Sequence, residues 1–297
     1  MAEESPSSSP PALGTGIAIV TIILTLAAWT TIPLFLRSFT EDIDGWTANG
    51  WRYGISALIW LPPLVWAMRR GEAGADLWKR AFWPSVFNIL AQICFGLAPY
   101  YIPPGLMTFS LRFQIVFVAV AAAILFLPER RIIRQGTFLI GLGVVLAGTS
   151  GTLFLDKDMQ LWSTIKALIM GGDVPGPPVG GAVGGAVGAG EHERAIGVAL
   201  AIGSGILYAG YALSVRWWLQ GRNPFIAFAA VSQYTAVGLV ACMLVFARQL
   251  EAPYARDFGA GVLHLEWPVL VKLVLSALIG IGIGHTLYYF SMARLGL

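Results

Sequence analysis

Charged residues are scarce in this chain. Asp, Glu, Lys and Arg make up only 12% of its 297 residues, whereas hydrophobic residues make up 57% and the mean hydropathy is +0.72. Soluble domains carry about 25% charged residues, so a soluble globule of this composition could not cover its surface with polar groups. The composition excludes a soluble domain, a disordered chain, a disulfide-rich secreted module and a nucleic-acid-binding protein. It predicts a protein that has the lipid bilayer as its solvent.

Cysteines and metal-ligand patterns are nearly absent too. Cys94 and Cys242 both lie in apolar stretches and form no Cys-x-x-Cys pair, which predicts two small buried side chains. No cluster of Cys, His, Asp or Glu has the spacing of a metal site, so we expect no metal and no cofactor. Residues 1–13 lack the positively charged start of a signal peptide, and their Ser and Pro content predicts a short disordered tail.

Long hydrophobic runs, by contrast, are plentiful. Eight stretches are long and apolar enough to predict membrane-spanning helices, namely 14–36, 47–68, 81–101, 105–127, 136–155, 195–219, 224–247 and 268–293. These runs are continuous and do not alternate with period two, which indicates an all-α polytopic membrane protein rather than a β-barrel. The loops on the same side of the membrane as the N-terminus hold more Lys and Arg than the loops on the other side. That excess predicts a cytoplasmic N-terminus.

The longest predicted loop, 156–194, contains the Gly-rich run GGDVPGPPVGGAVGGAVGAG. No Gly-Lys-Ser/Thr follows it and no strand precedes it, so a phosphate-binding loop is not supported and a flexible linker is predicted. This linker divides the chain into a first half with five spans, 14–155, and a second half with three spans, 195–297.

The two halves share short motifs in the same order. Gly16-Ile-Ala-Ile matches Gly197-Val-Ala-Leu, and Leu26-Ala-Ala-Trp29 falls on Leu207-Tyr-Ala-Gly210. Because the first half has an odd number of spans, the second copy would be inverted in the membrane. Two further spans would complete this second copy after Leu297. We therefore expect eight helices of a ten-helix inverted-repeat bundle, the alternative being a natural eight-span protein.

These features together resemble the drug/metabolite transporter superfamily, specifically proteins with two EamA-type five-helix repeats. The motifs that carry the resemblance are Ala27-Ala-Trp29, Trp51-Arg-Tyr53, Leu127-Pro-Glu-Arg-Arg131, Ile206-Leu-Tyr-Ala-Gly-Tyr211 and Tyr288-Tyr-Phe-Ser-Met-Ala-Arg-Leu-Gly296. The resemblance implies an inner-membrane carrier that moves small metabolites by alternating access.

Two arginines inside the predicted spans are the strongest candidates for substrate contact, because charge at membrane depth is costly. Arg52 lies near the mouth of the second span and either contacts an anion or snorkels to the lipid headgroups. Arg112 lies about seven residues into the fourth span, too deep to snorkel, which favours a cavity or a buried pair. All 16 acidic residues lie in the tail, the loops or the span ends. Embedded positive charge without carboxylates predicts an anionic or zwitterionic substrate, such as an amino acid.

The uncharged polar residues of the spans allow two interpretations. Asn88 and Gln92 share one helical face, and Gln233 lies mid-span in the seventh helix. Each of these side chains contacts either the substrate or a neighbouring helix.

Aromatic residues and one histidine complete the predicted site. Trp29 with Thr30 in the first span, and Tyr208 with Tyr211 in the sixth, occupy related places in the two copies and either line a central site or serve ordinary packing. In the last span His285 follows Gly280-Ile-Gly-Ile-Gly284 and precedes Tyr288. His285 is either a hydrogen-bonded structural residue or the proton-coupling group of the carrier.

The sequence therefore predicts a secondary transporter or exporter of small metabolites, and not an enzyme. The alternative is a membrane-embedded lipid-modifying enzyme, which would need clustered Asp or His residues for metal or acid–base chemistry. The expected partners are a small-molecule substrate and the lipid bilayer. The lack of embedded carboxylates predicts a facilitator or exchanger, or coupling through His285.

Overall fold

The computed structural model describes residues 12–126, 129–155 and 191–295, and within these ranges every regular element is helical. The longer helices are α1 (Ala12–Phe39), α2 (Gly45–Arg69), α3 (Ala75–Leu97), α4 (Pro104–Leu111), α5 (Gln114–Leu125), α7 (Gly136–Leu155), α9 (Glu191–Leu219), α10 (Pro224–Phe246), α11 (Trp267–Ser276) and α12 (Gly284–Leu295). The shorter ones are α6 (Glu129–Ile133), the 3₁₀ helices η1 (Ala98–Tyr100) and η2 (Ala260–His264), and the π-helix η3 (Ala277–Ile283). Nearly all of the predicted tail and linker lie outside the described residues.

Six of the segments in this part of the chain are long and apolar enough to cross a membrane. They are Gly16–Phe39, Ala75–Tyr100, Pro104–Leu125, Glu193–Leu219, Pro224–Phe246 and Trp267–Arg294. Each of them matches a predicted span to within a few residues at most ends, as expected for a prediction from the length of continuous apolar runs. The chain is thus an all-helical, multi-pass membrane protein.

Two predicted spans, in α2 and α7, fall outside this set for different reasons. Helix α7 is apolar throughout, but the part of it assessed as a span, Gly136–Thr152, is short for a membrane crossing. Helix α2 has 25 residues and is long enough, but it contains four tryptophans, two prolines, Asn49 and Arg52. Its polar residues face the interior of the bundle, where both Asn49 and Arg52 are buried. The membrane crossing of these two helices stays a prediction.

The predicted span 105–127 corresponds to the apolar segment Pro104–Leu125, and its helix is interrupted once. Helix α4 ends at Leu111 and α5 begins at Gln114. Between them the backbone N–H groups of Arg112 and Phe113 bond to the carbonyls three residues earlier, a tighter turn than the α-helix. Gly205 of α9 packs against this break, since a Cβ there would lie 2.8 Å from the Leu111 carbonyl oxygen.

A side-chain cap fixes the start of α2. Oδ1 of Asp44 accepts hydrogen bonds from the backbone N–H groups of Trp46 and Thr47, at 2.9 and 3.1 Å. The Thr47 hydroxyl donates a further bond to Oδ2 of Asp44. An aspartate at this position satisfies the first free N–H groups of the helix and stabilises it. The register of the polar residues that follow in α2 is thereby set.

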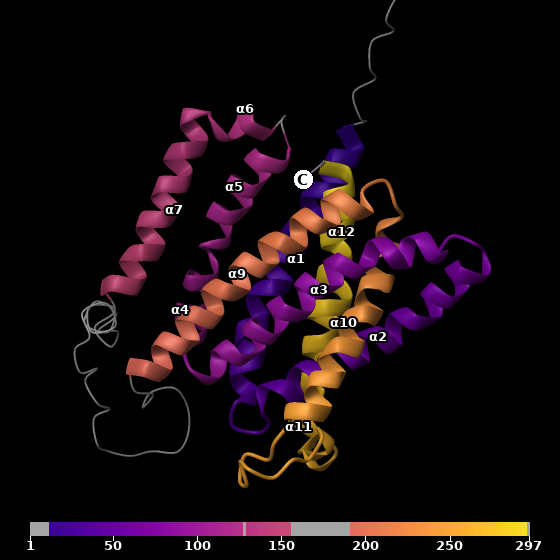
Figure 1. The fold of residues 1–297 in the computed structure, drawn as a ribbon, viewed down its shortest axis with the longest axis vertical. Helices are drawn as coiled ribbons and strands as arrows, with labels where there is room; N and C mark the ends of the chain where they lie inside the picture. Colours follow the sequence, from indigo (N-terminus) through magenta and orange to yellow (C-terminus); the bar gives the residue numbers. More distant parts are fainter. Residues whose placement is uncertain (1–11, 127–128, 156–190, 296–297) are drawn as a thin grey trace, which may run out of the picture.

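The main helix–helix contacts join one half of the chain to the other half. Helix α3 packs against α9, α12 packs against α1, and α2 packs against α10. Figure 1 shows that α1 and α9 run in opposite directions through the bundle. An inverted repeat would give both features, because the third helix of each copy would meet the first helix of the other. The repeat itself stays a prediction.

Glycine allows the close approach of α3 and α9. A Cβ on Gly210 would lie 2.6 Å from Cδ1 of Phe87 on α3. Gly203, two turns earlier on α9, has no atom within 4 Å of such a Cβ. The two glycines are chemically identical and differ only in what lies beside them.

We therefore expect Gly210→Ala to lower the thermal stability of the purified protein, by about 1–3 kcal/mol, because overpacking forces α3 and α9 apart. Gly203→Ala should leave stability unchanged or raise it, since alanine is the better helix former. Thermal unfolding in detergent, followed by circular dichroism, measures both variants. Equal melting temperatures for the two would contradict the observed packing.

Candidate functional site

Arg52 is the largest side chain among the fully buried residues, with only 1% of its surface exposed. Its Nε donates to Oγ of Ser276 at 3.1 Å, and its Nη1 donates to Oδ1 of Asn49 at 3.4 Å. Both acceptors are neutral. Within the described residues Arg52 forms no ion pair, and the pairs found there join Asp76 to Arg80 and Arg222 near the surface. A guanidinium in the centre of the bundle therefore has no counter-ion among the residues that the structure describes.

Close packing of α2 on α3 holds this guanidinium in place. Nδ2 of Asn49 donates to the backbone carbonyl of Gln92 at 2.7 Å, so the same amide joins α3 to Arg52. Gly96 makes this possible, because a Cβ there would collide with the Asn49 side chain. On the opposite side, a Cβ on Gly280 would lie 3.7 Å from Nη2 of Arg52.

Polar groups with unused hydrogen-bonding capacity surround the arginine. Tyr53 and Tyr208 lie within electrostatic range of the Arg52 guanidinium. The hydroxyl of Tyr53 is buried and lies beside the Asn88 side chain, but it forms no hydrogen bond of normal geometry. Asn88 donates from Nδ2 to Oγ1 of Thr235 at 3.1 Å, but its buried Oδ1 accepts no bond. Unpaired buried polar atoms are costly, and a polar ligand can supply the missing partners.

His285 forms the centre of a second, aromatic group beside Arg52. Its ring is 5% exposed, and its centroid lies 5.1 Å from that of Trp29, 5.7 Å from Phe228 and 6.2 Å from Tyr211. The Nδ1 atom is buried without a partner. Arg52 lies within electrostatic range of His285. Gly280 lies between the two groups, since its carbonyl accepts from Trp29 and a Cβ on it would lie 3.7 Å from Nη2 of Arg52.

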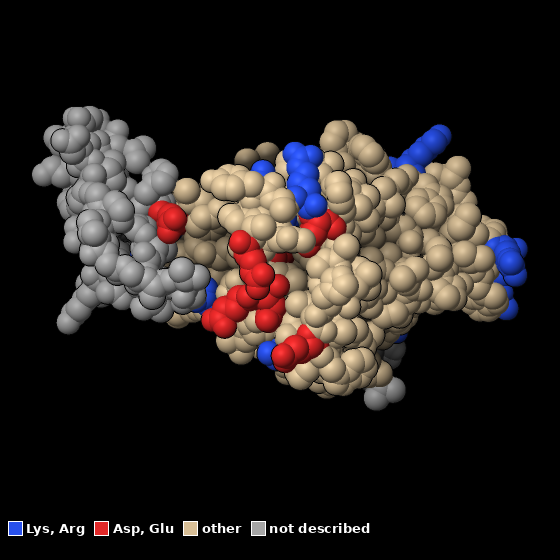
Figure 2. Space-filling view, turned by 90° about the horizontal axis from the view of Figure 1, so that it is seen from below, with Lys and Arg blue, Asp and Glu red and all other residues tan. Residues whose placement is uncertain are grey.

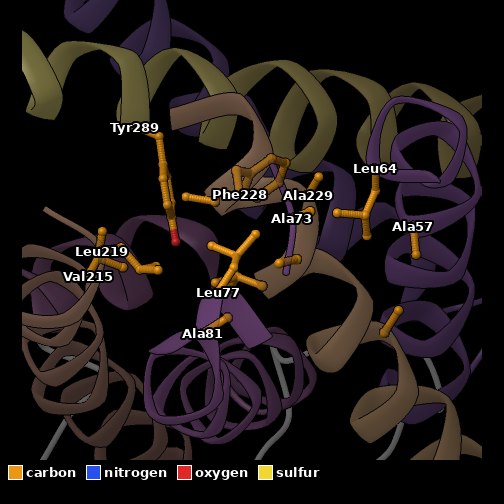
Figure 3. Close-up of a cluster of buried hydrophobic side chains, with 14 of the residues drawn as sticks. Ala57, Leu64, Ala73, Leu77, Ala81, Val215, Leu219, Phe228, Ala229 and Tyr289 are labelled. Atoms are coloured by element: carbon orange, nitrogen blue, oxygen red, sulfur yellow. The ribbon is translucent and has the colours of Figure 1, made fainter. Parts of the chain in front are cut away.

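A hydrogen bond between tyrosines continues this aromatic group. The Tyr211 hydroxyl on α9 donates to the Tyr289 hydroxyl on α12 at 3.0 Å. Figure 3 shows Tyr289 extending from α12 between Phe228 of α10 and Leu219 of α9. This bond therefore joins the first and the last helices of the second half of the chain at the site.

The π-helix η3 brings the last span close to α1. Nε1 of Trp29 donates to the carbonyl of Gly280 at 3.2 Å, and a Cβ on Gly284 would lie 2.7 Å from the same nitrogen. Ile32 occupies the space that a Cβ on Gly280 would need. Single π turns inside α-helices are frequent at functional sites. Here one such turn lies between Ser276, which binds Arg52, and His285.

Most of the sequence-predicted site residues meet in this region. Those that lie in it or directly beside it are Trp29, Arg52, Asn88, Gln92, Tyr208, Tyr211, His285 and Tyr288. The alternative that Arg52 snorkels to the headgroups is wrong, because its side chain is fully buried between α2 and the last span.

The remaining three candidates lie apart from it. Arg112 is exposed at the break between α4 and α5, which excludes a buried pair, and the alternative that it lines a cavity stays a prediction. Thr30 is exposed and donates to the Ala27 carbonyl in its own helix at 2.8 Å. Gln233 donates from Nε2 to the Ala57 carbonyl at 2.9 Å, which fits its predicted role between helices.

Sequence reasoning missed Asn49, Tyr53, Ser276 and Tyr289. Asn49 could have been found, because it precedes Arg52 by three residues and so shares its helical face. Ser276 and Tyr289 gave no such signal, since their roles depend on contacts with residues far away in the sequence.

No family model, curated protein or solved structure matches this chain. In the described part of the chain no group of three or more His, Cys, Asp or Glu side chains is arranged to hold a metal ion. The site is therefore characterised by its own geometry.

A double-mutant cycle tests whether Arg52 serves stability. Ser276→Ala should destabilise the protein by about 1–3 kcal/mol, because it leaves a buried guanidinium N–H without its acceptor. Arg52→Met should leave stability unchanged or raise it, since replacing a buried charge by an apolar side chain of similar volume removes a desolvation cost. In the Arg52→Met background, Ser276→Ala should have little further effect. A large loss of stability in Arg52→Met would show that the arginine is structural.

Proposed function

We propose that this protein is a secondary transporter for small anionic or zwitterionic metabolites, such as amino acids or small carboxylates. The observation that carries the proposal is Arg52, a fully buried guanidinium with two neutral hydrogen-bond partners and no ion pair within the described residues. Moving a charge out of water costs several kcal/mol even after relaxation of the surroundings. A stabilising role is a weak reason to keep such a group, and recognition of a negative ligand is a strong one.

The chemistry of arginine supports a carboxylate as the ligand group. A guanidinium presents parallel N–H donors that match the two oxygens of a carboxylate, and such paired bonds are strong in a dry interior. In Arg52 two of the nitrogens already have neutral acceptors, Ser276 and Asn49. A ligand carboxylate would replace these weaker partners. The unpaired Nδ1 of His285 offers a second polar contact nearby.

Alternating access fits the position of the site. Arg52 lies in the interior, where helices from both halves of the chain meet, and the π-helix η3 interrupts the last span beside it. In many carriers an interrupted helix lies at the central site, and two repeats move against each other around it. The packing of helices from one half against the other supports this proposal, as does the resemblance to EamA-type carriers. Coupling through His285 and simple exchange both remain part of the proposal.

The test is uptake of radiolabelled compounds into proteoliposomes that contain the purified protein. We expect saturable uptake of at least one small carboxylate or amino acid, and none of sugars or of simple organic cations. Arg52→Gln should lower this uptake by about tenfold to a hundredfold, the loss expected for a hydrogen bond between charged groups. Arg52→Lys should retain part of it, because the charge remains while the paired donors are lost.

The control is Arg256→Gln, which removes an exposed arginine of the loop between α10 and η2. Its uptake should equal that of the wild type. Uptake of a carboxylate that is unchanged in Arg52→Gln, in protein that folds normally, would overturn the proposed role of the arginine. Uptake restricted to cations or neutral compounds would overturn the proposed substrate class.

A further inference from the structure

One face of α2 carries a row of buried polar atoms that have no hydrogen-bond partner. They are the Tyr53 hydroxyl, the Ser56 hydroxyl and Nε1 of Trp60. Spacings of three and four residues place these side chains on the same face, about one helical turn apart. The row begins beside Arg52 and continues toward the C-terminal end of the helix.

Unpaired atoms of two neighbouring helices belong to the same region. Oδ1 of Asn88 on α3 and Oγ of Ser232 on α10 are buried without a partner. Helix α10 lies directly against this stretch of α2, because Gln233 donates to the Ala57 carbonyl and Trp60 lies 5.6 Å from the Phe228 ring. Asn88 is bonded to Thr235, one turn along α10 from Ser232. Three helices therefore contribute unpaired polar atoms to one region.

Local bonding does not account for these hydroxyls. Buried serines and threonines in helices usually donate to a carbonyl one turn earlier, and Thr235 and Ser276 do so at 2.8 Å. Ser56 and Ser232 form no such bond. Each unpaired buried group costs about 1–3 kcal/mol, and folded proteins contain few of them. Several in one region indicate that these atoms have partners in another state of the protein, with water or a polar solute between the helices.

Apolar side chains close the far end of this region. Figure 3 shows the residues involved, which lie where α2, α3, α9 and α10 converge, and the buried set there comprises Leu64, Ala67, Leu77, Ala81, Leu219 and Phe228. In this structure the polar row is thus separated from solvent by a few small and aliphatic side chains.

The surface beyond that closure carries mainly positive charge. The α2–α3 and α9–α10 loops and the helix ends beside them lie there. Their basic residues, Arg69, Arg70, Lys79, Arg80 and Arg222, outnumber their acidic residues, Glu72 and Asp76. The opposite end of the bundle carries acidic loops, as Figure 2 shows, with Glu41, Asp42, Glu251, Asp257 and Glu266. A positive rim concentrates anions at the end of the molecule toward which the polar row leads.

We propose that Tyr53, Ser56, Trp60, Asn88 and Ser232 line the route by which a small anion travels between Arg52 and the basic end of the bundle. The route is closed by apolar side chains in this structure, and it becomes hydrated when α2 and α10 separate at that end. This inference rests on the proposed transport function and adds the path, the gate and the residues that line it. The gate is the apolar closure around Leu77 and Phe228.

Cysteine substitution tests the route without requiring knowledge of the substrate. In a background with Cys94→Ala and Cys242→Ala, Ser56→Cys and Ser232→Cys change one atom at each position and should fold normally. Proteoliposomes are treated with the anionic, membrane-impermeant reagent sulfonatoethyl methanethiosulfonate, and labelling is read by mass spectrometry. We expect both cysteines to react. The cationic trimethylammonium analogue should react at least tenfold more slowly, because Arg52 and the basic rim repel it.

Two matched controls lie on the same helix. The control substitutions are Leu58→Cys and Ala48→Cys. Leu58 is 69% exposed on the outer face of the bundle, and Ala48 is fully buried away from the polar row. Neither should react, since lipid covers the first and packing the second. Absence of labelling at both Ser56→Cys and Ser232→Cys, in protein that transports a carboxylate, would overturn the route and leave the proposed function standing. Anion-selective labelling in protein that transports no anion would contradict the proposed function and leave the hydrated route standing.

Discussion

The burial of one guanidinium without a carboxylate is the constraint on which the rest of this structure depends. Arg52 would be expensive in any apolar interior, and here it is held by two neutral side chains from different helices. The cap at Asp44 sets its register, and Gly96 admits the amide of Asn49 that orients it. Close packing serves to present a positive charge to the interior rather than to neutralise it.

A carrier needs its ligand to interact differently with two conformations, since equal affinity for both shifts nothing. In the proposed function Arg52 would provide such a difference, because its acceptor Ser276 lies directly before the π turn of the last span. A carboxylate that takes the place of Ser276 would release that span from α2. The same turn binds Trp29 of α1, so ligand binding and helix movement share one element.

The all-helical, multi-pass character could be predicted from the sequence, because long apolar runs leave few alternatives in lipid, whereas the number of spans and the inverted repeat stay predictions. The ranking of the two arginines could not be predicted. Depth along a predicted helix favoured Arg112 over Arg52, yet Arg112 lies exposed between α4 and α5 whereas Arg52 is fully buried. Burial depends on which helix faces which, and a linear pattern does not contain that information. The unpaired atoms of Tyr53 and Ser56 are likewise a property of packing.

The most direct test of the central claim is a distance between Arg52 and the ligand. Solid-state NMR in liposomes can measure dipolar coupling between ¹⁵N-labelled arginine and the ¹³C carboxyl carbon of the compound that the uptake assay identifies. We expect coupling to a single guanidinium within about 4 Å, the range of a paired hydrogen bond, and its disappearance in Arg52→Lys. Saturable binding of that compound without any guanidinium coupling, or coupling that persists in Arg52→Lys, would contradict the account.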